Sequence, residues 1–262
     1  MDLGLAGAAA CVVGGTRGMG RACAERLAGE GARVAVLARD GAAAAEVARE
    51  LGSECLGLAA DIVDSAAVDA AFVAIADAWG ELNTLVVAAG PPTQRVRWYE
   101  VTDADWLAAY DLGALGPVRC LRAALPLLRR ASWARAVVLG AMSTRAPGSE
   151  RIAYTSTKAA LAMLTKQISI DLAPEQILVN TVSPGAVFTD QLRAKRDHDA
   201  PGVPDDPDAL MEWIATRGGF RAQTGRIGLP HDVADVVTFL ASPRNNYVTG
   251  ANLNVDGGSG FL

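Results

Sequence analysis

Apolar runs of strand length alternate with helical patterns from one end of the chain to the other. The predicted strands span Ala8–Val13, Arg33–Leu37, Glu54–Ala59, Thr84–Ala88, Ala136–Ala141, Ile177–Val182 and Asn252–Val255. The predicted helices span Met19–Glu30, Ala42–Leu51, Ser65–Trp79, Asp105–Arg130, Ala153–Leu172 and His231–Ala241. The strands are continuous apolar runs, which is typical of strands buried on both faces. This order predicts an α/β fold of the Rossmann type, a doubly wound parallel sheet of about seven strands with helices on both faces.

The segment 189–229 breaks this alternation, because it contains no strand-like run. Prolines and aspartates occupy its middle, and large apolar residues surround them: Leu192, Leu210, Met211, Trp213, Ile214 and Phe220. A connection this long inside a compact domain is usually functional or disordered. We interpret it as a lid with an apolar underside over a ligand cleft. The alternative is a surface insertion whose aromatic residues pack locally.

Composition excludes several classes of protein. The chain has 262 residues, 51% of them hydrophobic, so a single domain over 1–262 with a substantial core is expected. A net charge of −5 without a basic cluster argues against a nucleic-acid partner. No apolar stretch reaches the roughly 20 residues that span a membrane. The start, Met1-Asp2-Leu3, lacks the positive segment of a signal peptide, so a cytoplasmic location is expected. The cysteines and histidines show no metal-ligand spacing, so no metal site is predicted.

A glycine-rich turn, Gly14-Gly15-Thr16-Arg17-Gly18-Met19-Gly20, joins the first predicted strand to the first helix. Glycines permit a tight turn and close approach of the backbone to a pyrophosphate. The helix N-terminus that follows offers free N–H groups and the positive end of the helix dipole. Glycine-rich turns also arise by chance, but the position between a strand and a helix favours a dinucleotide site. The residues expected to bind the cofactor here are Gly14, Thr16, Arg17, Gly18, Met19 and Gly20.

The glycine spacing is Gly-x-x-x-Gly-x-Gly, and later motifs accompany it: Asp61, Ala89-Gly90, Tyr154-x-x-x-Lys158, Pro184-Gly185 and Val255-Asp256-Gly257-Gly258. Together these motifs, spread over almost the whole chain, resemble those of the short-chain dehydrogenase/reductase family. The resemblance implies that Ala89 and Gly90 lie at the cofactor and that Asp61, with Ile62 beside it, binds the adenine. The alternative for Asp61 is a role in a turn or a helix cap.

The end of the second predicted strand indicates which nicotinamide cofactor is used. A chain that prefers NAD would carry an acidic residue there to bind the ribose hydroxyls. This chain has Ala38 and Arg39 instead, and Arg17 lies in the glycine turn. Two guanidinium groups suit a 2′-phosphate by charge and by bidentate geometry, which predicts NADP(H). Alternatively both arginines are solvated surface charges, and Asp40 next to Arg39 opposes the phosphate interpretation.

Tyr154 and Lys158 are four residues apart on a predicted helix and therefore share a face. The ordinary pKa of tyrosine is about 10, and a nearby ammonium lowers it. The resemblance implies that Tyr154 donates a proton to a carbonyl oxygen. It also implies that Lys158 binds the nicotinamide ribose and tunes Tyr154. A lone Tyr-x-x-x-Lys pair is mostly incidental, but this pair follows the fifth predicted strand.

Other positions depart from the family pattern. The family's serine, thirteen residues before the tyrosine, falls at Ala141, and its asparagine in the long helix falls at Gly113. Val87-Ala88 replaces the usual asparagine pair. Ser143 lies two residues beyond Ala141, roughly 6–7 Å farther along an extended chain. A bent loop would bring Ser143 into reach as a catalytic donor; otherwise it only caps or lines the loop.

By the same resemblance, the backbone after the sixth strand wraps the nicotinamide, beginning at Pro184 and Gly185. Val187 contacts the carboxamide through its main chain, and Thr189 binds the carboxamide or a phosphate. The alternative for Thr189 is a cap on a lid helix. Substrate contacts then fall to the variable rim, which comprises 91–94, Trp98, the 143–150 loop and the lid.

These motifs predict an NADP(H)-dependent oxidoreductase that reduces a ketone, or oxidises the matching alcohol, by hydride transfer. One alternative is a non-hydride enzyme on the same scaffold, such as an isomerase or a dehydratase. Another is a protein that senses NADP(H) without turnover. The family's enoyl-reductase branch uses a wider tyrosine-to-lysine spacing, and Leu161 stands at the seventh position after Tyr154 here. The expected partners are a small carbonyl or alcohol substrate and further copies of the chain, as a homotetramer or else a dimer.

Overall fold

The computed structural model describes residues 2–92, 96–148, 150–218 and 221–259. Its sheet has seven strands in the order β3-β2-β1-β4-β5-β6-β7, and every neighbouring pair is parallel. The strands are β1 (Ala9–Val13), β2 (Arg33–Ala38), β3 (Leu56–Ala59), β4 (Thr84–Val87), β5 (Ala134–Leu139), β6 (Ile177–Pro184) and β7 (Asn252–Val255). The strand order reverses between β1 and β4, which creates the switch point where such sheets bind ligands. The predicted fold class is confirmed.

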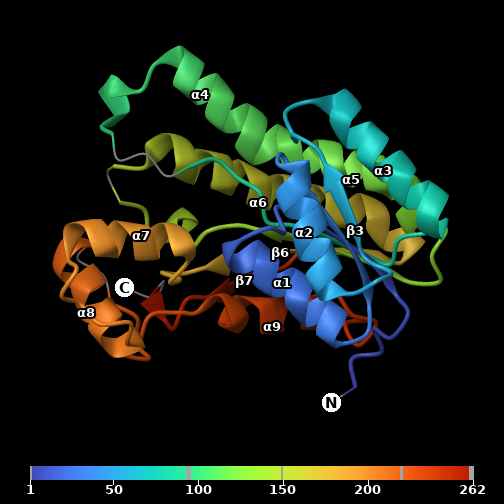
Figure 1. Ribbon diagram of the computed structural model, residues 1–262. Coiled ribbons are helices and arrows are strands. Elements are labelled where there is room, and N and C mark those ends of the chain that lie inside the picture. The colour runs from blue at the N-terminus through green and yellow to red at the C-terminus, as the bar shows by residue number, and fades with distance from the viewer. Residues whose placement is uncertain (1, 93–95, 149, 219–220, 260–262) are drawn as a thin grey trace.

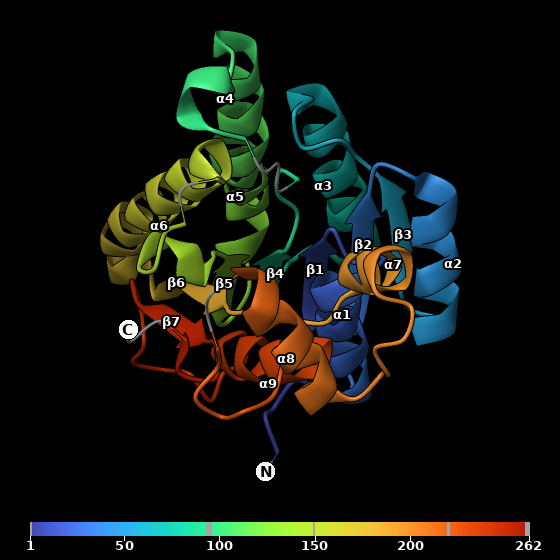
Figure 2. The same cartoon turned by 90° about the vertical axis from the view of Figure 1, so that its left-hand side faces the viewer.

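Helices cover both faces of the sheet (Figure 1, Figure 2). On one face lie α1 (Gly18–Gly29), α2 (Gly41–Leu51) and α9 (Pro230–Leu240), and on the other lie α3 (Ser65–Trp79), α5 (Gly116–Leu128) and α6 (Ile152–Leu172). Successive strand residues feed opposite cores: Cys11 packs with the α3 and α5 side, and Val12 with the α1 and α9 side. Because both faces are covered, the strands are apolar without alternation.

The helix predicted over 105–130 is not one regular helix. The structure instead has α4 (Asp103–Tyr110), a π-helical turn over Asp111–Leu115, and then α5. Arg119 braces this turn, because its guanidinium donates to the Asp111 carboxylate at 2.6 Å and to the main-chain oxygen of Ile62 at 3.2 Å. Gly113, Gly116 and Pro117 disfavour a regular helix at this point, a signal that the predicted continuous helix did not take into account. Single π turns are frequent at functional sites, and Gly113 lies in this one.

The 189–229 segment folds into α7 (Asp190–Asp199) and α8 (Pro207–Gly218) at the end of the molecule where β7 also ends (Figure 1). As predicted, no strand occurs among its described residues. Its large apolar side chains form a core of their own: Phe188, Leu210, Met211, Trp213, Ala222 and Ile227. These side chains therefore pack locally instead of forming an open apolar underside; Phe220 lies outside the described residues. A lid role for the segment stays a prediction.

None of the helices in the described ranges is long and apolar enough to cross a membrane. In the same part of the chain, no three His, Cys, Asp or Glu side chains come together as a metal site would require.

Candidate active site

The residues predicted at the site meet at the carboxyl edge of the sheet. A Cβ atom added at Gly14 would lie 2.9 Å from the main-chain nitrogen of Ala89, so the turn after β1 touches the turn after β4. A Cβ atom added at Gly90 would lie 3.0 Å from the Nζ atom of Lys158. The glycine turn, the end of β4 and helix α6 therefore surround one place at the switch point, as the sequence predicts.

The glycine turn has the backbone that a pyrophosphate requires. Gly14 and Gly18 have φ angles of +80° and +53°, in the left-handed region that favours glycine. A side chain at Gly20 would collide with the main-chain oxygen of Gly14, so only glycine lets α1 begin this close to β1. Arg17, at the N-cap position, makes no side-chain capping bond. The first N–H groups of α1 thus keep their capacity to bind an anion, and Thr16 and Met19 lie half-buried beside them.

Arg17 and Arg39, the two arginines predicted to hold a 2′-phosphate, are both exposed. Neither forms an ion pair with a described residue. Ala38 ends β2, and Arg39 follows it. Asp40 has a structural role, because its carboxylate accepts hydrogen bonds from the first N–H groups of α2 at 3.0 and 3.1 Å. These N-cap bonds, both to Oδ1, give Asp40 a structural role separate from cofactor binding.

Asp61 and Ile62 follow β3 at the same edge of the sheet. The carboxylate of Asp61 accepts a hydrogen bond from the main chain of Val63 at 3.2 Å, so the turn role considered for Asp61 is present. Ile62 is buried, and a Cβ atom at Gly116 would lie 2.6 Å from its Cδ1 atom. The contact with adenine stays a prediction for both residues.

Tyr154 and Lys158 lie in the first two turns of α6. Lys158 is buried and donates a hydrogen bond from Nζ to the main-chain oxygen of Leu139 at 2.6 Å, which places its ammonium at the end of β5. Burial lowers the pKa of Lys158 to about 8. Burial also raises the pKa of the Tyr154 phenol, and the Arg151 charge opposes this only in part. Tyr154 therefore keeps its proton at neutral pH, contrary to the expected lowering by Lys158.

The loop that carries Ala141 and Ser143 is bent, so the distance estimated for an extended chain does not apply. β5 ends at Leu139, and residues Met142–Thr144 form a 3-10 turn. The Oγ1 atom of Thr144 donates to the main-chain oxygen of Ala141 at 3.0 Å and closes the turn. Ser143 thereby reaches helix α6, where its Oγ atom accepts a hydrogen bond from Oγ1 of Thr155 at 3.3 Å. Thr155 directly follows Tyr154.

Gly113, at the position of the family's asparagine, is closely surrounded. A Cβ atom there would lie 2.8 Å from Oγ1 of Thr157 and 3.0 Å from Cδ of Pro91. The Thr157 hydroxyl itself donates to the main-chain oxygen of Tyr154 at 2.8 Å. Thr157, which the sequence did not point to, and Pro91 of the predicted rim therefore fill the space an asparagine side chain would need. The hydroxyl-rich run Thr155-Ser156-Thr157 between Tyr154 and Lys158 is the signal that could have drawn attention to them.

The backbone after β6 approaches the glycine turn. A Cβ atom at Gly18 would lie 3.4 Å from Cγ2 of Thr189. Thr189 occupies the N-cap position of α7, but its side chain makes no capping bond, so its hydroxyl is not used as the cap considered above. Val187 is buried and pairs with Gly228 in an isolated bridge that joins the two ends of the lid segment.

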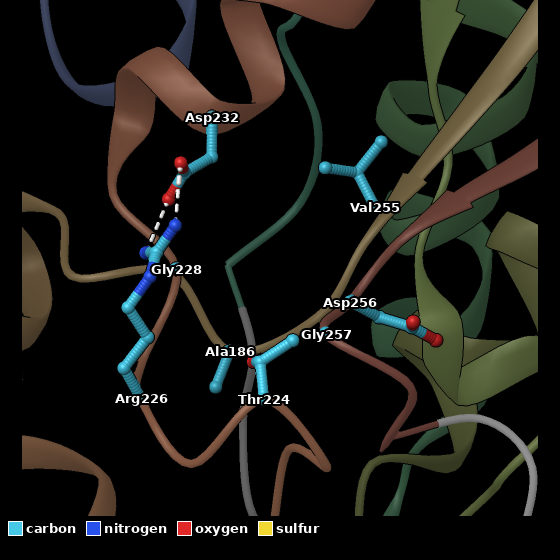
Figure 3. Close-up of a pocket in the computed structure, with 8 residues that line it drawn as sticks. All are labelled: Ala186, Thr224, Arg226, Gly228, Asp232, Val255, Asp256 and Gly257. Atoms are coloured by element: carbon cyan, nitrogen blue, oxygen red, sulfur yellow. Dashed lines mark hydrogen bonds and ion pairs between the residues drawn. The ribbon is translucent and has the colours of Figure 1, made fainter. Parts of the chain in front are cut away.

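A cavity of about 270 Å³ lies between the base of the lid segment and the end of β7 (Figure 3). Arg226 and Asp232 form one wall, joined by two hydrogen bonds of 2.7 and 2.8 Å, and this pairing lowers the pKa of Asp232 to about 2. Val255 lies across the cavity from Asp232, and Ala186 and Thr224 also line it. Thr224, Arg226 and Gly228 come from the 189–229 segment expected to contact substrate, whereas none of the residues predicted to bind the cofactor or to act in catalysis lines this cavity.

The site geometry agrees with the comparisons to known proteins. A family model described as enoyl-(acyl carrier protein) reductase matches residues 13–260. The short-chain reductase protein NovJ of Streptomyces niveus is 32% identical over 252 residues, which cover 95% of this chain and 92% of that protein. The chain belongs to the short-chain dehydrogenase/reductase family.

Two solved structures show how closely this short-chain dehydrogenase/reductase matches the family architecture. L-Sorbose reductase from Gluconobacter frateurii, complexed with NADPH and L-sorbose, superposes with a TM-score of 0.91 at 27% identity, covering all of both chains (100% and 100%). The 3-ketoacyl-(acyl-carrier-protein) reductase from Brucella melitensis, complexed with NADH, superposes with a TM-score of 0.85 at 28% identity, covering 98% of this chain and 100% of that one. Both of these solved structures are of reductases in complex with a nicotinamide cofactor.

Proposed function

We propose that this protein is an NADP(H)-dependent reductase of a ketone, and in the reverse direction a dehydrogenase of the matching alcohol. The observation that carries the proposal is the position of Tyr154 and Lys158. The Lys158 ammonium lies against Gly90 and Leu139, at the ends of β4 and β5, and Tyr154 lies one helical turn before it. A protonated phenol at the switch point of such a sheet is a general acid placed where a carbonyl and a nicotinamide can meet.

Bound NADPH would supply the hydride that adds to the carbonyl carbon. Tyr154 transfers its phenolic proton to the carbonyl oxygen, so that the ketone gains one hydride and one proton and becomes the alcohol. Lys158 binds the ribose hydroxyls, and its charge stabilises the phenolate until solvent returns the proton. The pyrophosphate is held by the turn from Gly14 to Gly20 and the start of α1. Pro184, Gly185, Val187 and Thr189 provide the main-chain and hydroxyl contacts to the carboxamide end.

The preference for NADP(H) is part of this proposal, because the solved relatives include complexes with both NADPH and NADH. Its support is electrostatic. Arg17 and Arg39 are exposed and carry no ion pair with a described residue, whereas Asp40 is engaged at the start of α2. Two guanidinium groups without an ion pair favour a 2′-phosphate over a bare ribose.

Carbonyl reduction is favoured over enoyl reduction by the spacing of the catalytic pair. The wider tyrosine-to-lysine spacing of the enoyl-reductase branch would place its lysine at the seventh position after Tyr154. That position is Leu161 here, and its aliphatic side chain is buried in the hydrophobic core beside α5. A protein that only senses NADP(H) has no need of a phenol that keeps its proton beside Lys158. Ala141 and Gly113, which stand where the family has a serine and an asparagine, are the changes that would accompany non-hydride chemistry. The assay below distinguishes a non-hydride enzyme from a reductase.

We also infer that the chain assembles with copies of itself, as a tetramer or else a dimer. Large apolar side chains are exposed on neighbouring helices α4 and α6: Leu107 is 72% exposed, Met163 61% and Ile170 66%. Met163 and Ile170 are seven residues apart and therefore lie on one face of α6. Exposed apolar surface of this kind marks an interface. The lid role of 189–229 and the cytoplasmic location remain predictions.

The test is a screen of NADPH oxidation with ketones, quinones, 3-oxoacyl thioesters and, for comparison, enoyl thioesters, with the product identified by mass spectrometry. The proposal expects oxidation that depends on a carbonyl compound and is lost in Tyr154→Phe. An isomerase or dehydratase would convert its substrate without consuming NADPH, and a sensor would bind NADPH without turnover. Conversion of substrate without NADPH consumption, or binding of NADPH without turnover, overturns the proposal. NADPH consumption with enoyl thioesters alone also overturns it.

A further inference from the structure

Among the threonines and serines of the loop after β5 and the first turns of α6, Thr155 makes a hydrogen bond of a different kind from its neighbours. Thr144 donates to the main-chain oxygen of Ala141, Ser156 to that of Ala153, and Thr157 to that of Tyr154. These three hydroxyls therefore satisfy backbone acceptors within their own turns. Thr155 instead donates across the gap between two elements, to the Oγ atom of Ser143 at 3.3 Å.

This hydrogen bond leaves the Ser143 hydroxyl able to act as a hydrogen-bond donor. Ser143 uses a lone pair to accept from Thr155, and its own proton is not donated to any described residue. Ser143 is half-buried, so its hydroxyl remains reachable. A hydroxyl that accepts a hydrogen bond becomes a stronger donor, because each bond in a chain polarises the next. The pair thus presents one oriented O–H donor beside the first turn of α6.

The location of this donor is set by the same elements that place Tyr154. Ser143 follows the end of β5 by four residues, and Lys158 anchors α6 to that end through Leu139. Thr155 is the neighbour of Tyr154 in the first turn of α6. At position 141, by contrast, stands a buried alanine that offers no hydroxyl.

We propose that Thr155 is a positioning residue that holds Ser143 as the hydrogen-bond donor to the substrate's carbonyl oxygen, and that the two hydroxyls together replace the serine absent at Ala141. This inference rests on the proposed reductase function. In the reaction, negative charge develops on the carbonyl oxygen as hydride adds to the carbon. A donor already aimed at that oxygen stabilises the transition state more than the ground state.

The experiment is a double-mutant cycle on Thr155→Val and Ser143→Ala, assayed with NADPH and the 3-oxobutanoyl thioester of N-acetylcysteamine, and repeated with ethyl 3-oxobutanoate. Valine keeps the branched shape of threonine and removes only the hydroxyl. We expect Ser143→Ala to lower kcat by about 10–100-fold, and Thr155→Val to lower it by several-fold, with the KM for NADPH unchanged in both. On the Ser143→Ala background, Thr155→Val should cause no further loss.

Two further variants separate positioning from folding. Thr155→Ser keeps the hydroxyl and should retain most of the activity. Ser156→Ala removes the neighbouring hydroxyl, whose bond is local, and should leave kcat unchanged. If Thr155→Val proves unstable in thermal unfolding, Thr155→Ala in the same cycle replaces it.

The possible failures are distinguishable. If Thr155→Val lowers kcat equally with and without Ser143, or if Ser143→Ala keeps full activity while Tyr154→Phe loses it, this inference is wrong and the reductase function stands. If Tyr154→Phe keeps full activity, or if the wild type reduces no carbonyl compound, the reductase function fails and the inference fails with it.

Discussion

The Nζ atom of Lys158 donates a 2.6 Å hydrogen bond to the main-chain oxygen of Leu139 and thereby attaches helix α6 to the end of strand β5. The bond compensates only part of the cost of burying an ammonium, since a carbonyl oxygen carries no formal charge. The pKa of Lys158 is accordingly lowered to about 8. The charge of this lysine thus depends on pH near the physiological range.

The first prediction concerns pH. We expect kcat/KM for reduction to fall as the pH rises through about 8, because Lys158 loses its proton there in the free enzyme. Tyr154, whose pKa burial raises, keeps its proton over the same range and does not cause the fall. Since kcat/KM reports groups of the free enzyme, initial rates from about pH 6 to about pH 10 measure this directly. A profile that is level through pH 8 would contradict the role given to Lys158.

The second prediction concerns the acid. Tyr154→Phe keeps the ring and its packing but removes the proton, so turnover of a carbonyl substrate should fall by about 10²–10⁴, the usual contribution of a positioned acid. NADPH binding, followed by fluorescence, should change little, because the phenol is not its main contact. Tyr110→Phe, on the neighbouring helix α4, is the matched control and should keep wild-type turnover.

The third prediction concerns cofactor choice. Arg39→Ala should weaken the binding of NADPH and barely affect NADH, because only NADPH carries the 2′-phosphate that a guanidinium would contact. Arg49→Ala, in the last turn of α2, removes an equal charge from a site distant from the end of β2 and controls for a change in net charge. Equal losses of affinity for both cofactors in Arg39→Ala, measured by titration, would eliminate the phosphate role.

The fourth prediction concerns the π turn. Gly113→Asn should destabilise the fold by about 1–3 kcal/mol, the usual cost of overpacking, because its Cβ atom would meet Thr157 at 2.8 Å and Pro91 at 3.0 Å. Thr157→Ala clears the closer of these contacts, so the double variant should recover part of the loss. Urea unfolding of the wild type, the two single variants and the double variant gives the coupling free energy between positions 113 and 157. Additive effects would show that the close packing described here does not exist.

The fifth prediction concerns assembly. Wild-type protein at micromolar concentration should show the mass of a tetramer or a dimer in light scattering. Met163→Glu places a charge on the exposed apolar face of α6 and should shift the mass toward that of one chain, without loss of helical circular dichroism. Val73→Glu, at an exposed apolar position on α3, serves as the control. A wild-type protein with the mass of a single chain would refute the assembly proposal.

Some features of this protein follow from its sequence alone because they depend on neighbouring residues. Burial on both faces leaves continuous apolar runs, so the strands are visible in the sequence, and β7 has the predicted bounds. Helical geometry places residues four apart on one face, so Tyr154 and Lys158 had to face the same way. The capping role of Asp40 was also within reach, since an aspartate just before an alanine-rich helix is a typical N-cap.

Other features depended on how distant segments pack. The hydrogen bond between Ser143 and Thr155 spans twelve residues and exists only because β5 ends at Leu139 and the loop after it turns. The space at Gly113 is limited by Pro91 and Thr157, which come from two other parts of the chain. The direction of the pKa shift at Tyr154 follows from burial, which outweighs nearby charge. Periodicity reports whether a residue is buried, whereas the partner of a polar group, and the room beside a glycine, are decided only when separate elements come together.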